Sequence, residues 1–155
     1  MDVVDRQLLD ALRANARATY AELARIVNLS APAVHERVAK LEAGGVITGY
    51  HASVSPESLG YAMNALVGIF LTDDADTDVV ADQLAALPTV EHCWFVAGEE
   101  TFIVKVRVPD VAGLESAIRT LNGMAGVART RTTVVLSTKF EDRVPGGDGG
   151  PPLSG

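Results

Sequence analysis

Apolar residues recur at helical spacing through the first third of the chain and predict three short helices before residue 45. In each helix the apolar positions lie three or four residues apart, so they form one stripe that can face a shared core. We expect the first helix over residues 5–14, the second from residue 21 and the third from about residue 31. The three stripes are Val4, Leu8 and Leu12, then Leu23, Ala24 and Val27, then Val34, Val38 and Leu41.

A tight turn is expected between the second and third of these helices. Asn28 tolerates the left-handed conformation that ends a helix, and Ser30 is a residue type that caps the start of the next one. Gly44 and Gly45 then stop the third helix. Two helices joined in this way, with another helix before them, indicate a helix-turn-helix DNA-binding unit.

The third helix has a polar face opposite its apolar stripe, as expected of a helix that enters the major groove of DNA. Small residues at its start allow the helix to approach base edges, and polar residues follow farther along. The alternative is an ordinary helical hairpin whose polar face is only solvated. The residues predicted to bind DNA are Ser30, Ala31, Pro32, Ala33, His35, Glu36, Arg37 and Lys40.

The pattern changes after the glycine stop. Residues 46–54 alternate like a strand, and Ser55-Pro56 with Gly60 marks a break that leads into a second domain. Thr77 and Asp110 are candidate caps at the starts of two further helices. From residue 64 on, the predicted order is strand, helix, strand, strand, helix, strand, over residues 64–71, 77–86, 90–96, 101–108, 110–122 and 127–139.

The predicted sheet has one strongly apolar face. Along residues 101–108, alternate positions carry Phe or Val on one side and Ile103, Lys105 and Arg107 on the other. Two amphipathic helices can cover the apolar face of a four-stranded antiparallel sheet in the ferredoxin-like βαββαβ arrangement. The other face retains apolar residues, and a second copy of the chain is expected to cover it. The predicted fold class is therefore α+β, with a winged-helix-like helix-turn-helix domain joined to a ferredoxin-like domain.

Composition limits the class of protein. The chain has 155 residues and 48% apolar residues, enough for one domain or two small ones. It has no run of about 18 apolar residues, and Asp2 and Asp5 stand where a secretory segment would be basic, so we expect a cytoplasmic protein without membrane contact. Cys93 is the only cysteine, which excludes an internal disulfide, and its apolar surroundings predict a buried thiol.

The net charge of −7 is unusual for a DNA-binding protein, because neutralisation of phosphates dominates affinity for DNA. Residues 1–50 carry six basic and six acidic side chains, whereas residues 51–155 carry seven basic and fourteen acidic ones, so the deficit (0 and −7) belongs to the second part. A neutral DNA-binding unit predicts weak binding by one copy and hence a multimer.

No pattern of residues suggests catalysis. The three histidines are scattered without a cysteine or carboxylate at ligand spacing, and neither a phosphate-binding glycine loop nor a nucleophile elbow occurs. We therefore expect no enzyme, no metal and no cofactor. His92, beside Trp94, is expected in a core or an interface.

These two halves in this order resemble the Lrp/AsnC family of transcription regulators, also called feast/famine regulators. The resemblance covers nearly everything up to about Arg143. It rests on the DxxD pattern at Asp2 and Asp5, on AELA, on LSAPAVHERVAKLEAGGVITGY, and on a C-terminal part that ends in TRTTVVLST. It implies a regulator whose dimers pair through their sheets, assemble further into tetramers of dimers or similar forms, and bind an amino acid or related metabolite between subunits.

The resemblance also implies an effector site at the turn between the second and third sheet strands. The family's pattern there is Gly, Asp or Asn, any residue, then Asp, whereas this chain has Gly98, Glu99, Glu100 and Thr101. Gly98 allows close backbone approach, and either glutamate can pair with an ammonium group. A plain hairpin turn with solvated acids is the alternative. Ser137 corresponds to a region that lines the family's pocket.

The sequence thus predicts a DNA-binding domain over residues 1–50, a linker with a strand over 51–63, an effector-binding and oligomerisation domain over 64–143, and a disordered Gly/Pro-rich tail over 144–155. The expected function is transcriptional regulation through double-stranded DNA, responsive to an amino acid. The alternative is a metabolite sensor that acts through protein partners without sequence-specific DNA binding.

Overall fold

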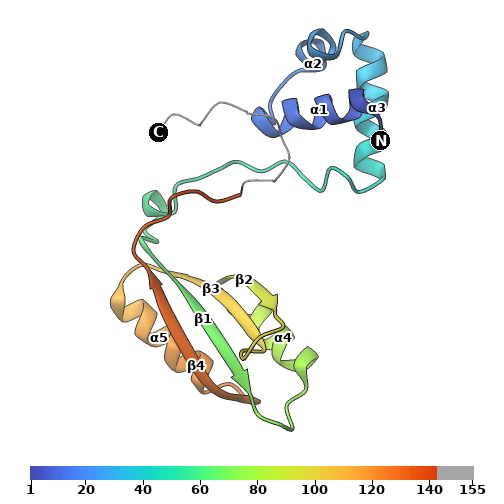
Figure 1. The fold of residues 1–155 in the computed structure, drawn as a ribbon. Helices are drawn as coiled ribbons and strands as arrows, with labels where there is room; N and C mark the ends of the chain where they lie inside the picture. The colour runs from blue at the N-terminus through green and yellow to red at the C-terminus, as the bar shows by residue number, and fades with distance from the viewer. Residues whose placement is uncertain (143–155) are drawn as a thin grey trace. The chain divides into compact units, whose positions relative to one another are not determined.

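The computed structural model describes residues 1–142, and these form two compact units, Met1–Ser53 and Val54–Glu141. The first unit is helical and the second has a sheet with helices (Figure 1). The α+β fold class is confirmed. The domain boundaries drawn from the sequence stay predictions, and the tail predicted over 144–155 lies outside the described residues.

The helical unit contains α1 (Val3–Ala14), α2 (Tyr20–Val27) and α3 (Ala31–Ala43). All three predicted stripes point inward, and Leu8, Leu23 and Val34 are fully buried. Helix α1 begins two residues earlier than its apolar pattern predicts. The reason is a capping box, in which the Asp2 carboxylate accepts from the Asp5 N–H at 2.8 Å and the Asp5 carboxylate accepts from the Asp2 N–H at 2.9 Å.

The strand predicted over residues 46–54 is absent, and the described chain has no strand before Met63. Residues 48–54 have neither helical nor strand structure. Their alternation is a real strand signal, but a strand needs a hydrogen-bonding partner, and no other described segment pairs with this one. The helix-turn-helix is present, and only the strand expected beside it at residues 46–54 is missing from the described residues.

The sheet unit contains a four-stranded antiparallel sheet of order β2-β3-β1-β4. This is the predicted ferredoxin-like arrangement, with α4 following β1 and α5 following β3. Its elements are η1 (Glu57–Leu59), β1 (Met63–Leu71), α4 (Thr77–Ala85), β2 (Val90–Phe95), β3 (Phe102–Val108), α5 (Val111–Asn122) and β4 (Val127–Val135).

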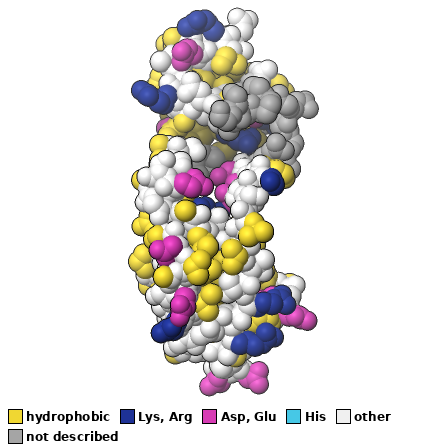
Figure 2. Space-filling model, turned by 90° about the vertical axis from the view of Figure 1, so that its left-hand side faces the viewer, with side chains coloured by type: hydrophobic (Ala, Val, Ile, Leu, Met, Phe, Trp, Pro, Cys, Tyr) yellow, Lys and Arg dark blue, Asp and Glu magenta, His cyan; other side chains and the backbone are white. Residues whose placement is uncertain are grey.

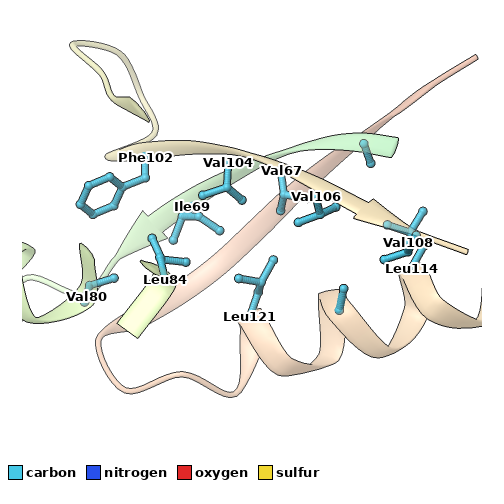
Figure 3. Close-up of a cluster of buried hydrophobic side chains, with 12 residues drawn as sticks. Val67, Ile69, Val80, Leu84, Phe102, Val104, Val106, Val108, Leu114 and Leu121 are labelled. Carbon is cyan, nitrogen blue, oxygen red and sulfur yellow. The ribbon is translucent and has the colours of Figure 1, made fainter. Parts of the chain in front are cut away.

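The core of this unit lies between the sheet and its two helices. Figure 3 shows the inward side chains of β1 and β3 above Leu84 of α4 and Leu114 and Leu121 of α5. The strands alternate, so Val67 and Val104 point to the helices while Gly68 and Ile103, which are also opposite each other in register, point away. Among residues 1–142, helices cover one of the two sheet faces, and we call the other the open face.

Three local predictions were wrong. Helix α4 is capped by Asp76, whose carboxylate accepts from the N–H groups of Asp78 and Val79, and not by Thr77. Strand β4 ends at Val135 and not at residue 139, because Val135 pairs with Asn64 near the start of β1 and no described residue pairs with β4 beyond it. Cys93 is exposed on the edge strand β2, although partial burial raises the pKa of its thiol.

Candidate DNA-binding and effector sites

Helix α3 presents the predicted DNA-binding face to solvent. Ser30 caps it, since the Ser30 hydroxyl accepts from the Ala33 N–H at 3.3 Å, and Pro32 lies in the first turn, where no backbone donor is needed. Val34 and Val38 are buried beneath the helix. The side chains exposed on the other side are Pro32, His35, Glu36 and Lys40, with Ala31, Ala33 and Arg37 half-buried.

The turn before α3 has the predicted left-handed residue. Asn28 has φ 54° and ψ 48°, and the next N–H, that of Leu29, returns to the Ala24 carbonyl at 3.0 Å. A capping box between Thr19 and Glu22 fixes the start of α2. Contacts between residues close in sequence therefore define where α2 begins and where it ends.

Arg37 differs from the other predicted DNA contacts, because its guanidinium reaches back to the start of α1. Its Nη1 lies 2.7 Å from Asp2 Oδ2 and 2.8 Å from Asp5 Oδ1. The hydrogen bonds that Arg37 donates to Asp2 and Asp5 raise the pKa of Arg37. The hydrogen bond from the Asp5 backbone N–H and then that from Arg37 lower the pKa of Asp2. The two carboxylates that open the chain thus cap α1 and also attach α3 to it.

Lys40 and His35 have local partners on the exposed face. The Lys40 ammonium donates to Glu36 at 2.8 Å across one helical turn, and this hydrogen bond lowers the pKa of Glu36. His35 makes an edge-on contact with the Tyr20 ring, with centroids 4.8 Å apart. Surface pairs of this kind are worth little, so DNA phosphates can compete for Lys40.

Tyr50 connects the segment after α3 to that helix. Its hydroxyl donates to Glu42 at 2.7 Å, and burial together with this acceptor raises the pKa of Tyr50 to about 12. The apolar alternation that suggested a strand at residues 46–54 therefore includes a side chain that binds the helical unit itself.

The predicted effector turn connects β2 to β3. Thr101 is part of the backbone ladder there, since its N–H donates to the Ile69 carbonyl at 2.9 Å and its carbonyl accepts from Val96 at 3.1 Å. Gly98 and Glu99 are exposed, whereas Glu100 is half-buried. The four residues lie together, as any turn requires, and the turn presents one carboxylate to the solvent and the other to the sheet.

Arg131 of β4 binds both acids of this turn. The Glu100 carboxylate accepts from its guanidinium, and Glu99 Oε2 lies 3.8 Å from Arg131 Nη1. The Glu100 side chain lies over Gly68 of β1, where an added Cβ would come within 2.6 Å of Glu100 Cγ. No pattern in the sequence indicated this partner, because Glu100 and Arg131 are 31 residues apart.

Ser137 does not join this turn within one chain. It follows Val135, which pairs with Asn64 near one end of β1, whereas Thr101 bonds to Ile69 near the other end. With about 3.3 Å per residue along a strand, five residues of β1 separate the two places by roughly 16 Å. Ser137 and the Gly98 turn can therefore line one pocket only across subunits.

A second charged cluster lies on the open face and was not predicted. Lys105, only 7% exposed, lies 3.3 Å from Glu91 and also donates to Glu141, while Arg107 donates to Glu91 at 3.2 Å. Burial alone would raise the pKa of Glu91, but hydrogen bonds from Arg107 and Lys105 lower it. The basic residues were visible in the alternation of β3. Glu91 reaches them through a bulge between Val90 and His92.

The comparisons with known proteins agree with both halves of this structure. Residues 1–42 match the AsnC-type helix-turn-helix domain, and residues 64–145 match the Lrp/AsnC ligand binding domain. The chain belongs to the Lrp/AsnC family. It is a DNA-binding transcriptional regulator of the kind that responds to amino acids.

Relatives in the Lrp/AsnC family are similar over most of their length. The transcriptional regulator LrpA of Mycobacterium tuberculosis is 40% identical over 143 residues, which cover 92% of this chain and 95% of LrpA. The regulatory protein AsnC of Escherichia coli is 33% identical and covers 88% of this chain and 90% of its own. Both are named as regulators and neither as an enzyme.

Solved Lrp/AsnC structures share the fold. The structure of E. coli AsnC has a TM-score of 0.87 at 30% identity and covers 93% of this chain and 97% of its own. A feast or famine regulatory protein of M. tuberculosis, solved with L-methionine, has the same TM-score at 40% identity, with 92% and 97% covered. Within residues 1–142, no helix of this chain is long and apolar enough to cross a membrane. The same residues contain no group of three or more His, Cys, Asp or Glu that could hold a metal ion.

Proposed function

We propose that this regulator reads double-stranded DNA with the exposed face of α3, and that an amino acid bound at the Gly98 turn changes its affinity for DNA. DNA recognition by α3 is supported by the contrast between its buried and its exposed face. Its apolar stripe is buried, its first turn is capped by Ser30, and its small and polar residues face solvent. A helix of this form suits the major groove, with its N-terminal residues nearest the bases.

The residues of α3 take different roles in this proposal. Ser30, Ala31, Pro32 and Ala33 let the helix start approach the base edges closely, His35 and Glu36 face the groove, and Lys40 contacts a phosphate. Arg37 is the exception, since its guanidinium already binds Asp2 and Asp5. Its contribution to DNA binding is to hold α3 against α1, and a direct contact would require it to leave both carboxylates.

Homo-oligomerisation compensates for the weak charge of a single DNA-binding unit. Residues 1–50 have no net charge, and the open sheet face exposes 37% of Leu66 and 45% of Trp94. We place the contact between two copies on that face, giving a dimer and, through further contacts, a tetramer of dimers. Several binding units on one particle raise avidity by about 10² to 10⁴ over one unit.

The proposed effector is an amino acid or a closely related metabolite, with no cofactor needed. Two solved relatives contain L-methionine, one of them from Neisseria meningitidis. In this chain Gly98 leaves room beside the turn backbone, where the nearest side-chain atom to an added Cβ is 3.7 Å away. Glu99 and Glu100 supply negative charge for an ammonium group, and Ser137 joins from a neighbouring subunit.

The second candidate function is a metabolite sensor that acts through protein partners. It is supported by the internal pairing of Arg37 with Asp2 and Asp5 and of Lys40 with Glu36, which leaves little free positive charge on α3. Under this alternative the helical unit is a protein-docking surface.

A DNA-retardation assay with the chain's own upstream region, run at two salt concentrations, distinguishes the two functions. Binding that weakens as salt rises is expected of DNA recognition, because phosphate contacts release counterions. The matched variant is Lys40→Gln, with Lys139→Gln as a control outside α3. Absence of binding at both salt concentrations would favour the protein-docking alternative.

A further inference from the structure

Glu100, in the turn between β2 and β3, has its side chain held against the sheet by neighbouring residues of β1 and β4. Gly68 and Arg131 are opposite each other on β1 and β4. Because Gly68 has no side chain, the Glu100 side chain can lie flat over it, and only 11% of that side chain is exposed. The Glu100 to Arg131 ion pair is therefore partly shielded from water, unlike the pairs on the surface of α3.

Arg131 remains accessible while it makes this pair. Its side chain is 59% exposed, and Glu99 Oε2 lies 3.8 Å from its Nη1. Its guanidinium carbon is 5.9 Å from the centre of the Phe70 ring. One place on the surface thus offers two carboxylates and a guanidinium, all within reach of a small molecule.

We propose that Arg131 determines the specificity of the effector site by binding the effector's α-carboxylate. On binding, the effector's ammonium replaces Arg131 at the Glu100 carboxylate, and its carboxylate takes the planar fork of the freed guanidinium. This inference rests on the proposed location of the effector site at the Gly98 turn. One internal ion pair is exchanged for two pairs with the ligand, so both charges of the ligand are required.

The charge balance of the turn explains why such a residue is needed. Glu99 and Glu100 alone attract an ammonium but repel the carboxylate that every α-amino acid carries next to it. Arg131 removes this repulsion and favours zwitterions over simple amines. Arg131 already pairs with Glu100 in the free chain. A simple amine would have to displace Arg131 from Glu100 and has no carboxylate to offer Arg131 in return, so it binds less favourably than a zwitterion.

Calorimetric titration with two probes tests the role of Arg131. The probes are L-methionine and 3-(methylthio)propylamine, which is the same molecule without the carboxylate. For Arg131→Gln we expect L-methionine to bind at least about tenfold more weakly, while the amine binds as well as to the wild type or better. Arg131→Lys keeps the charge but not the fork, and its loss should be intermediate.

Arg129→Gln is the matched control, since Arg129 also faces outward on β4 and its guanidinium lies 3.5 Å from the centre of the Phe70 ring. It should leave L-methionine binding within about twofold. Circular dichroism checks that each variant folds. If Arg131→Gln does not fold, Arg131→Lys provides the test, with weaker binding of L-methionine and unchanged binding of the amine expected.

Two distinct results would overturn these proposals. If Arg131→Gln binds L-methionine as tightly as the wild type does, or loses both probes equally, Arg131 does not bind the carboxylate, and the effector site itself still stands. If the wild type gives no heat with L-methionine or any of the other common amino acids, the effector site is wrong and the role of Arg131 falls with it.

Discussion

Charged side chains connect helices in the helical unit, whereas in the sheet unit they lie across an open face. Arg37 binds the two carboxylates at the start of α1, and the core beneath is already closed by apolar residues. In the sheet unit, Arg131 and Lys105 bind acids on a face that no helix covers. Figure 2 shows one side of the molecule, on which hydrophobic side chains of the sheet unit gather with charged ones around them.

This difference separates two uses of charge. In the helical unit the ion pairs fix a geometry that a rigid ligand such as DNA can fit. On the open face they surround surface that remains available for a second copy or a small molecule. We infer that one unit is built to present a fixed shape and the other to change its contacts.

The largest expected effect tests whether the two units depend equally on their apolar cores. Leu8→Ala and Leu84→Ala remove side chains that are fully buried in the helical and the sheet unit, respectively. Each should lower the free energy of unfolding by about 2 to 5 kcal/mol, measured by denaturant titration. Val111→Ala, at a residue 69% exposed, should change it by less than about 0.5 kcal/mol. An equally small effect of Leu84→Ala would show that the sheet core is not packed as described.

Next in size is the close contact beneath Glu100. Gly68→Val places side-chain atoms where the Glu100 side chain lies, so it should cost about 1 to 3 kcal/mol and displace the acid from Arg131. Gly98→Ala meets only an ordinary contact at 3.7 Å and serves as the control. Thermal unfolding of both variants provides the measurement. Equal stability of Gly68→Val and the wild type would contradict the position of Glu100.

A smaller effect is expected when the connection between α1 and α3 is lost. Arg37→Gln should lower the melting temperature and weaken DNA binding without changing the slope of affinity against salt, because Arg37 holds α3 and touches no phosphate. Asp2→Asn should act in the same direction. A reduced salt slope for Arg37→Gln would show instead that Arg37 contacts DNA.

Asp2 also gives the stability of the helical unit a pH dependence, because its carboxylate accepts from the Asp5 backbone N–H and from Arg37. The pKa of Asp2 is lowered from 3.8 in the folded chain, so its contribution to stability is present above that value and is lost as pH falls through the lowered pKa. Melting temperatures followed from pH 5 downward should therefore fall less steeply for Asp2→Asn than for the wild type. Parallel curves would mean that Asp2 does not contribute.

The smallest effect belongs to the single phosphate contact of Lys40. Lys40→Gln should weaken binding to all DNA sequences alike and reduce the salt slope by about one. Fluorescence titration at several salt concentrations measures this. An unchanged affinity and slope would place the DNA-binding face elsewhere on the helical unit.

The sequence predicted those parts of the molecule in which one residue type at regular spacing decides the structure. The stripe of Val34, Val38 and Leu41 identified the buried side of α3, and the alternation of β3 identified the buried side of the sheet. Asn28 and Ser30 located the turn, because their conformational and capping preferences are local.

What the sequence did not predict depends on contacts between distant residues. The strand expected at 46–54 is missing since no described segment pairs with it. An arginine such as Arg37 is a residue type that often contacts DNA, and only the folded structure shows that its guanidinium is paired with Asp2 and Asp5. The partnership of Glu100 with Arg131 depends on strand order, and that of Glu91 with Lys105 on a bulge. The local sequence pattern predicts neither of these two ion pairs.

The central claim is that an amino acid acting on the sheet unit changes how the helical unit binds DNA. The most direct measurement is the affinity of the full chain for its own upstream DNA, with and without each of the common amino acids in turn. At least one should shift the dissociation constant by about 5- to 150-fold, as expected for coupling of 1 to 3 kcal/mol. The same dissociation constant with every amino acid, or no DNA binding at all, would contradict the claim.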